Sequence, residues 1–265
     1  MTVTVKDVID RLNASGIALP DGADRLIAGD LSAEVNAIAV AFMPSRRILA
    51  KAWELGANLV VVHEGAFYSH ASIGENGGVL DAVSSAKRRW IEESGLAIYR
   101  CHDGIHRQRP DGIAEGLILE LDWHPYVVEY TPVAAVVHLP SGTLGGVARH
   151  VKQRLGIDSL RAVGDPEMPC RKVGVLVGYR GGREHAVPLF ETYGLDLVIC
   201  GEGPEWETPE YVRDSIDMEK PKALLVVGHR ESEQPGMKLL ADRMRDLFPS
   251  VLVHYCREES LFRSL

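Results

Sequence analysis

Short runs of apolar, β-branched residues alternate with longer amphipathic segments along most of the chain. The apolar runs are bounded by Gly, Pro or polar residues, as in strands that are buried on both faces of a sheet. They predict strands at 36–42, 58–63, 96–101, 133–139, 172–178, 195–200, 223–228 and 251–255. The segments between them predict helices at 45–55, 79–94, 111–121, 143–155, 184–193, 208–217 and 233–247. This alternation is typical of an α/β protein.

Glycines mark the ends of several predicted helices. Gly56, Gly95, Gly156 and Gly194 each follow the last apolar position of a helix, where a left-handed cap residue is expected. These positions support the predicted boundaries between helices and strands.

The N-terminal segment has the apolar spacing of an amphipathic helix. Val5, Val8, Ile9 and Leu12 would share one helical face, and no long apolar stretch follows a basic start as in a signal peptide. The apolar runs elsewhere are far shorter than the roughly 20 residues that a membrane-spanning helix needs. We therefore expect a cytoplasmic protein with no membrane association.

Composition and charge narrow the possible functions. The chain has 265 residues, of which 46% are hydrophobic and 25% charged, so one large or two smaller globular domains are expected. The net charge of −8 argues against nucleic-acid binding, which requires clustered Lys and Arg. The four cysteines form no C-x-x-C pair, so neither a disulfide framework nor a zinc ribbon is indicated.

A faint internal repeat suggests two related halves. The segments ELGANLVVVHEG (54–65) and TYGLDLVICGEG (192–203) share Gly, Leu, Val, Glu and Gly in register, and both predict a helix cap, a strand and a turn. The repeat places Glu202 of the second half at the position of Glu64 in the first, although a common α/β frame could produce it by chance.

The boundary between the halves is predicted from a segment without a helix pattern. WHPYVVEYTP (123–132) contains two prolines and separates the halves, and we place the return boundary near Gly228. The predicted domains are a discontinuous first α/β domain, 1–126 plus 229–265, and a second α/β domain, 127–228.

Histidines and acidic residues follow three of the predicted strands. They are His63-Glu64, the segment CHDGIH (101–106) and the segment GHRESE (228–233). Ligands of open α/β sheets bind beyond the carboxyl ends of strands. The three segments are therefore candidates for one shared site.

Each acidic group also has a structural interpretation. Glu64 could cap a turn, and Asp103-Gly104 is a favourable turn pair. If Ser232 caps the last helix, Glu233 in its first turn could simply complement the helix dipole. These interpretations leave the histidines of the three segments without a role.

The combination of imidazole and carboxylate groups indicates a divalent transition metal. Such ligands suit Zn, Fe or Mn, and the absence of cysteine ligands argues against a closed structural zinc site. Five or six ligands exceed what one catalytic ion takes from a protein, so we expect two ions that share a bridging water. Glu202 and Glu205 could add acid–base groups or could only cap a turn.

The three motifs, in this order and spacing, resemble the Ngg-one-interacting-factor-three (Nif-three-like) family, whose members are also labelled GTP cyclohydrolase I type 2 homologues. The resemblance covers nearly the whole chain and includes LPSGTLGGVARHVKQRLG, KVGVLVGYRGG and LDLVICGEGPEW. It implies two similar α/β domains, the second inserted into the first, with a two-metal site in the cleft between them. It also implies a toroidal homohexamer, built as a trimer of dimers.

Carried over by position, the resemblance implies five metal ligands: His63, Glu64, His106, His229 and Glu233. His102 matches the first histidine of the family's second motif. Two positions depart from the family, because Glu64 stands where His is usual and His106 where Asp is usual. The two departures together conserve three imidazoles and two carboxylates.

Two functions of different classes follow. The first is a metal-dependent hydrolase or cyclohydrolase-like enzyme acting on a small nucleotide-like or phosphorylated molecule, with His102 or Glu202 as a proton shuttle. GTP as the substrate is implied by the resemblance alone. The alternative is a non-catalytic metal-binding ring that serves as a scaffold or binds a regulatory protein partner.

Overall fold

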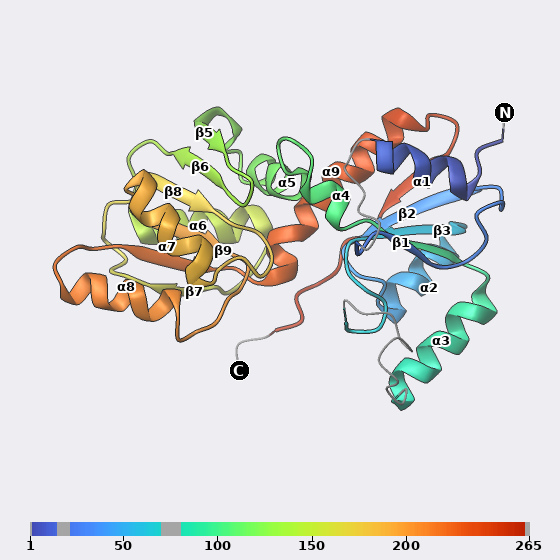
Figure 1. Cartoon of the computed structure of the whole chain (residues 1–265), viewed down its shortest axis with the longest axis horizontal. Helices are drawn as coiled ribbons and strands as arrows, with labels where there is room; N and C mark the ends of the chain where they lie inside the picture. Colours follow the sequence, from blue (N-terminus) through green and yellow to red (C-terminus); the bar gives the residue numbers. More distant parts are fainter. Residues whose placement is uncertain (1, 15–21, 70–80, 263–265) are drawn as a thin grey trace. The chain divides into compact units, whose positions relative to one another are not determined.

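The computed structural model describes residues 2–14, 22–69 and 81–262. The chain forms two compact units: unit 1 is Met1–Gln108 with Met237–Glu258, and unit 2 is Arg109–Gly236 with Glu259–Leu265. Both are α/β structures built on one sheet each (Figure 1). The domain bounds expected from the sequence, 1–126 plus 229–265 and 127–228, stay a prediction.

Unit 1 contains a five-stranded sheet of order β1-β4-β3-β2-β11. Its strands are β1 (Arg25–Ala28), β2 (Ala37–Ala41), β3 (Leu59–Val62), β4 (Ala97–Arg100) and β11 (Leu252–Tyr255). Its helices are α1 (Val5–Ala14), α2 (Arg46–Glu54), α3 (Ala82–Ser94), α4 (Asp103–His106) and the end of α9 (His229–Leu247). All neighbouring strands are parallel except β1, which pairs antiparallel with β4 at the edge.

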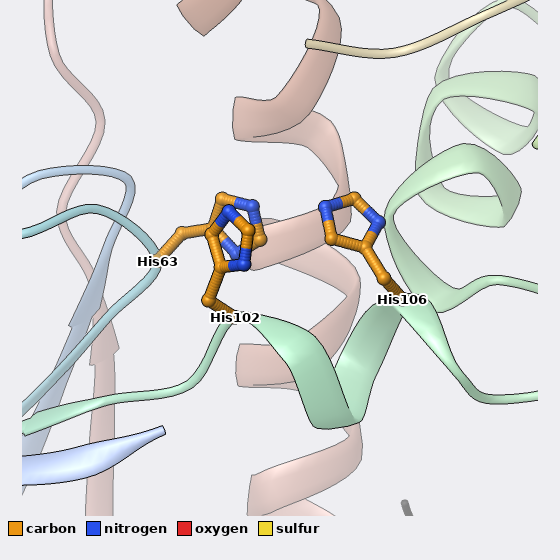
Figure 2. A group of neighbouring side chains, drawn as sticks. All are labelled: His63, His102 and His106. Atoms are coloured by element: carbon orange, nitrogen blue, oxygen red, sulfur yellow. The ribbon is translucent and has the colours of Figure 1, made fainter. Parts of the chain in front are cut away.

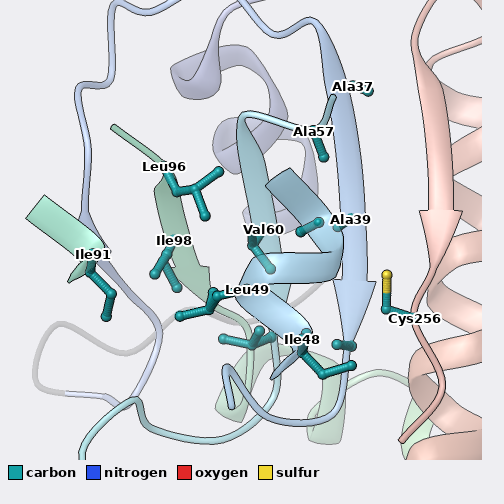
Figure 3. Close-up of a cluster of buried hydrophobic side chains, with 13 residues drawn as sticks. Ala37, Ala39, Ile48, Leu49, Ala57, Val60, Ile91, Leu96, Ile98 and Cys256 are labelled. Carbon is teal, nitrogen blue, oxygen red and sulfur yellow. The ribbon is translucent and has the colours of Figure 1, made fainter. Parts of the chain in front are cut away.

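The core of unit 1 follows from the two-residue period of its strands. Ala37, Ala39 and Ala41 of β2 point to the same face of the sheet, where they meet Ile48 and Leu49 of α2 (Figure 3). Val60, Ile98 and the α3 residue Ile91 complete this layer. The small β2 side chains let the larger helix residues approach the sheet closely.

Unit 2 contains a six-stranded sheet of order β5-β6-β8-β9-β10-β7. Its strands are β5 (Val127–Tyr130), β6 (Ala135–His138), β7 (Arg161–Val163), β8 (Lys172–Val175), β9 (Leu197–Cys200) and β10 (Ala223–Val226). Its helical segments are α5 (Gly112–Glu120), the short 3-10 helix η1 (His124–Tyr126), α6 (Leu144–Leu155), α7 (Arg183–Tyr193), α8 (Thr208–Asp217) and the start of α9 (His229–Leu247). The strands β8, β9 and β10 are parallel.

The two units repeat one topology. The order α1-β1-β2-α2-β3-α3-β4-α4 of unit 1 corresponds to α6-β7-β8-α7-β9-α8-β10-α9, and the sheet orders β1-β4-β3-β2 and β7-β10-β9-β8 match. Gly29 after β1 and Gly164 after β7 both have positive φ, 98° and 129°. A Cβ on Gly29 would lie 2.5 Å from the Cα of Ala97, and one on Gly164 would lie 3.0 Å from the Cβ of Ala223, in each case the first residue of the adjacent strand. The faint repeat in the sequence therefore reflects two similar α/β domains.

The predicted core elements are confirmed, including the N-terminal helix. The glycines at 56, 95, 156 and 194 all have positive φ, between 57° and 73°. Ser45, Asp81 and Thr143 cap the starts of α2, α3 and α6 through side-chain oxygens. Residues 79–80, the expected start of the predicted helix 79–94, lie outside the described residues.

The structure adds three strands that the sequence pattern did not predict and corrects the start of the last helix. The sequence pattern missed β1, β5 and β7, which are short strands at or near sheet edges with few buried side chains. The segment 123–132, which was predicted as the boundary between the halves, contains η1 and β5. The last helix begins at His229 rather than at Glu233, so Ser232 lies within α9 and is not its cap.

No helix among the described parts of the chain combines the length and apolar character required to span a bilayer. The longest helix, α9, has 19 residues and is rich in charged side chains.

Candidate metal site

The candidate metal ligands of unit 1 follow two adjacent parallel strands. His63 comes directly after β3, and His102 comes two residues after β4. The pairing of β3 with β4 matches Val62 with Arg100, so the segments leaving the two strands start side by side. The one-turn helix α4 then places His106 four residues beyond His102, on the same side of the turn.

Asp24 holds the start of α4. Its Oδ2 accepts a 2.7 Å hydrogen bond from the backbone N–H of Gly104, and its Oδ1 accepts bonds from the N–H groups of His102 and Asp103. In return, the side chain of Asp103 accepts a 2.8 Å bond from the N–H of Ala23. The Asp103-Gly104 pair is thus part of a capped helical turn, and this cap fixes the direction of His102.

Three imidazoles gather at these strand ends. The rings of His63 and His102 are stacked with centroids 4.4 Å apart, and His106 meets them edge-on at 5.0 and 5.2 Å (Figure 2). One ring nitrogen from each lies within 4.8 Å of the others. Figure 2 shows His102 and His106 rising from the two ends of α4, with His63 approaching from β3. Three converging imidazoles are a ligand set for Zn, Fe or other divalent transition metals.

Hydrogen bonds fix which nitrogen two of these rings present. His63 Nδ1 lies 3.0 Å from the carbonyl oxygen of Cys101, and His102 Nδ1 lies 2.8 Å from Asp103 Oδ1. A carbonyl and a carboxylate oxygen both accept, so Nδ1 carries the hydrogen in each ring. The Nε2 lone pairs are then directed away from these acceptors, which is the arrangement found around metal-ligating histidines.

The surroundings also favour a neutral His102 imidazole, the form that binds metal. Burial and, to a lesser extent, the neighbouring His63 and His106 rings lower the pKa of His102 to about 4, while the bond to Asp103 opposes the shift. His63 is fully buried. A neutral His102 whose tautomer is fixed by Asp103 fits a divalent metal.

Glu64 is directed to a buried arginine of β4. The guanidinium of Arg100 donates a 2.9 Å hydrogen bond to Glu64 Oε2 and a 3.0 Å bond to the carbonyl oxygen of His63. The arginine side chain is fully buried, and burial lowers its pKa although Glu64 opposes the shift. Glu64 Oε1 lies 4.0 Å from His102 Nε2. Arg100 therefore connects His63 and Glu64 to strand β4, the strand that precedes His102 and His106.

Unit 2 has its own histidine at the strand ends. His229 Nδ1 lies 2.8 Å from Glu202 Oε1, and its Nε2 lies 3.1 Å from Glu233 Oε2. Glu202 follows β9, while His229 and Glu233 occupy the first turns of α9 after β10. The side chain of Glu233 is 3% exposed. An imidazole between two carboxylates is suited to hold a cation at Nε2 while Glu202 fixes its tautomer.

Glycines make room for this arrangement. Gly178 has a φ of 59°, and a side chain there would overlap the carboxylate of Glu233. A Cβ on Gly201 would lie 2.5 Å from both the Gly178 carbonyl oxygen and Ser232 Oγ. The Ser232 hydroxyl accepts a 2.9 Å bond from the N–H of Gly178 and donates to the carbonyl of His229. The glycine turn after β8 thus supports the start of α9.

The structure places the predicted residues in two groups. Unit 1 brings together His63, His102 and His106 beside Glu64, and unit 2 brings together Glu202, His229 and Glu233. His102, expected as a proton shuttle, stands among the potential ligands. That all five predicted ligands serve one centre stays a prediction. Glu205 forms an exposed ion pair with Arg161.

Two supporting residues were missed in the sequence. A charged residue at position 100, at the end of an apolar strand and next to a motif, was a signal for the Arg100 ion pair. Asp24 offered no such signal, because it is 78 residues away from the backbone N–H of His102 that it binds.

Solved structures share this fold. A hypothetical protein from Staphylococcus aureus, SA1388, superimposes with a TM-score of 0.80 at 14% sequence identity, with 100% of each chain covered. A Bacillus cereus protein described as related to NIF3 gives a TM-score of 0.74 at 15% identity, covering 100% of this chain and 99% of that one. At such identities the likeness concerns the fold.

Sequence comparison connects the chain to one family. A Clostridium perfringens protein named GTP cyclohydrolase 1 type 2 homolog is 21% identical over 257 residues, which is 93% of each chain. The model of the Duf34/NIF3 (NGG1p interacting factor 3) family matches residues 4–259. Since this match spans nearly the entire sequence, the chain belongs to the Duf34/NIF3 family.

Proposed function

We propose that the protein is a metal-dependent hydrolase or cyclohydrolase-like enzyme that holds two divalent transition-metal ions per chain. Zn, Fe or Mn are the candidates, and the substrate is a small nucleotide-like or phosphorylated molecule. The observation that carries the proposal is the group of three imidazoles at the strand ends of unit 1, whose ring nitrogens lie within 4.8 Å of one another. The name of the Clostridium perfringens relative supports the substrate class.

Two sets of ligands would bind the metal ions. His63, His102 and His106 of unit 1 would bind through imidazole nitrogens, and His229 and Glu233 of unit 2 would supply an imidazole and a carboxylate. When bound, such ions polarise a substrate oxygen and make water nucleophilic at neutral pH. The buried Arg100 would keep Glu64 oriented beside His102.

Glu202 is the group best placed to handle protons. It holds His229 Nδ1 at 2.8 Å while remaining 45% exposed, so its carboxylate can also reach solvent. It can therefore fix the His229 tautomer and exchange a proton with a substrate or a water molecule. In this proposal Glu202 is the acid–base residue, and His102 acts as a ligand.

Elemental mass spectrometry on variants of each unit tests the proposal. We expect about two ions per wild-type chain, with loss from a His102→Ala, His106→Ala double variant and from a His229→Ala, Glu233→Ala double variant. His138→Ala is the matched control, since this exposed histidine at the end of β6 belongs to neither set. Hydrolysis of a panel of nucleotides and phosphate esters should stop with chelator and return with metal.

The outcomes separate enzyme from scaffold. Metal binding without turnover of any panel member, together with a metal-dependent hexamer in light scattering, would favour a non-catalytic ring that binds a protein partner. Metal content that is unchanged in both double variants would overturn the ligand assignment itself.

A further inference from the structure

Unit 1 contains a cavity that belongs to neither ligand set. It has a volume of about 360 Å³ and lies between the end of β1 and the helix α3. Ile27 and Gly29 line it from the β1 side, Arg88 and Ile91 from α3, and Phe67 closes it from the segment after β3. This volume is at the lower end of the range for small-molecule sites.

The inner wall of the cavity is continuous with the hydrophobic core. Ile91 and Leu96 belong to the buried cluster of unit 1 (Figure 3). Ile27, Ala28 and Phe67 pack against this cluster. A ligand entering here would contact aliphatic and aromatic carbon on several sides. The apolar part of the ligand would therefore be stabilised by burial, at about 25 cal/mol per Å² of apolar surface.

Arg88 brings a guanidinium group to this cavity. The guanidinium carbon of Arg88 lies 5.5 Å from the centroid of the Phe67 ring. Among the residues that the structure describes, Arg88 Nε has no hydrogen-bond partner although it is buried. A buried donor without an acceptor is costly, by about 1–3 kcal/mol. An acceptor on a bound molecule would remove this cost.

We propose that this cavity binds a small monocarboxylic acid with an aliphatic or aromatic body. Its carboxylate would accept a charge-assisted hydrogen bond from Arg88, and its body would rest against Phe67, Ile91 and Leu96. A single negative charge fits best, because Arg88 is the one cation among the lining residues, and the exposed Glu92 repels each further negative charge of a polyanion such as a phosphate. This site is independent of the proposed metal chemistry.

Calorimetric titration of the full-length protein with three probes of equal chain length tests the proposal. We expect saturable binding of octanoate at least tenfold tighter than binding of octanol, and no binding of octylamine. Arg88→Met retains the apolar stem but removes the guanidinium, so it should reduce the octanoate affinity to that of octanol and leave octanol unchanged. Arg89→Met, on the adjacent exposed arginine, should leave both affinities unchanged.

A second variant and a metal-free titration distinguish binding in this cavity from adsorption to the surface and from coordination to a metal ion. Ala28→Leu adds side-chain volume to the cavity wall and should weaken both octanoate and octanol. Since a carboxylate could also bind a metal ion, each titration is repeated after chelation, where octanoate should bind as before. The proposal fails if octanoate does not bind, if Arg88→Met binds it as tightly as the wild type, or if chelation abolishes binding.

Discussion

The two units have different side chains at the ends of corresponding strands. In unit 1, β3 runs into His63-Glu64-Gly65, whereas the corresponding β9 of unit 2 runs into Gly201-Glu202-Gly203. The last residue of β4 is the buried Arg100, whereas the last residue of β10 is Val226. Unit 1 therefore presents three imidazoles beside an ion pair, and unit 2 presents one imidazole between two carboxylates.

The difference follows from what each strand end must accommodate. Gly201 leaves space for the carbonyl of Gly178 and the hydroxyl of Ser232, so α9 can start close to the sheet. At the corresponding position His63 projects a full imidazole, and the turn α4 that follows β4 is short and held by Asp24. One backbone frame thus supports either a crowded imidazole group or a closely packed helix start.

The largest expected effect concerns the Arg100–Glu64 ion pair, which lies where unit 2 has Val226. Arg100→Met should lower the free energy of unfolding by about 3–5 kcal/mol, because it leaves the Glu64 carboxylate without its guanidinium partner. Urea denaturation followed by circular dichroism measures this loss. Adding Glu64→Gln should restore part of it, since the uncompensated charge is removed.

The corresponding change in unit 2 is the control. Val226→Ile conserves apolar character and adds one methylene group at a partly buried position, so it should cost about 1 kcal/mol. Equal losses of unfolding free energy for Arg100→Met and Val226→Ile would contradict this prediction. They would show that any substitution at this strand end is destabilising, whether or not it breaks an ion pair.

The second prediction concerns a lysine that unit 1 buries on α3. The ammonium of Lys87 donates to the Ala66 carbonyl at 2.5 Å, and burial lowers its pKa to about 8. In unit 2, the buried residues of α8 are Thr208, Val212 and Ser215, none of them charged. Between about pH 8 and pH 10.5 the unfolded lysine binds more protons than the folded one, so this group's contribution to stability rises with pH.

A Lys87→Met variant isolates that contribution. The difference in free energy of unfolding between wild type and variant should shift in favour of the wild type by up to about 3 kcal/mol from pH 7 to pH 10.5. Denaturation curves at several pH values measure it, with the exposed Lys51→Met as a control. Parallel pH profiles for wild type and Lys87→Met would contradict the expected shift.

The smallest expected effect tests the glycine that distinguishes β9 from β3. Gly201→Ala should lower stability by about 1–3 kcal/mol, because its methyl group would lie 2.5 Å from the Gly178 carbonyl and Ser232 Oγ. Gly142→Ala is matched to it, since the nearest atom to a new Cβ is 3.9 Å away. Thermal denaturation compares the two, and equal midpoints would mean that unit 2 tolerates a side chain at this strand end.

Some sequence signals were sufficient for the architecture. Strands buried within a sheet need apolar residues on both faces, so β2, β3, β9 and β10 appear as continuous apolar runs. Edge strands such as β7, whose side chains are mostly exposed, leave no such pattern. The start of α9 was misplaced because Ser232 has the chemistry of a helix cap but uses its hydroxyl inside the helix.

The sequence by itself determined the α/β class, the repeated halves and the residues that follow the strands, because these depend on local periodicity and on chain order. Tertiary structure alone decided how those residues are used. The cap from Asp24, the Arg100–Glu64 pair and the His229–Glu202 bond each join residues at least 27 positions apart. Such contacts depend on which strands become neighbours, and local sequence carries no record of that choice.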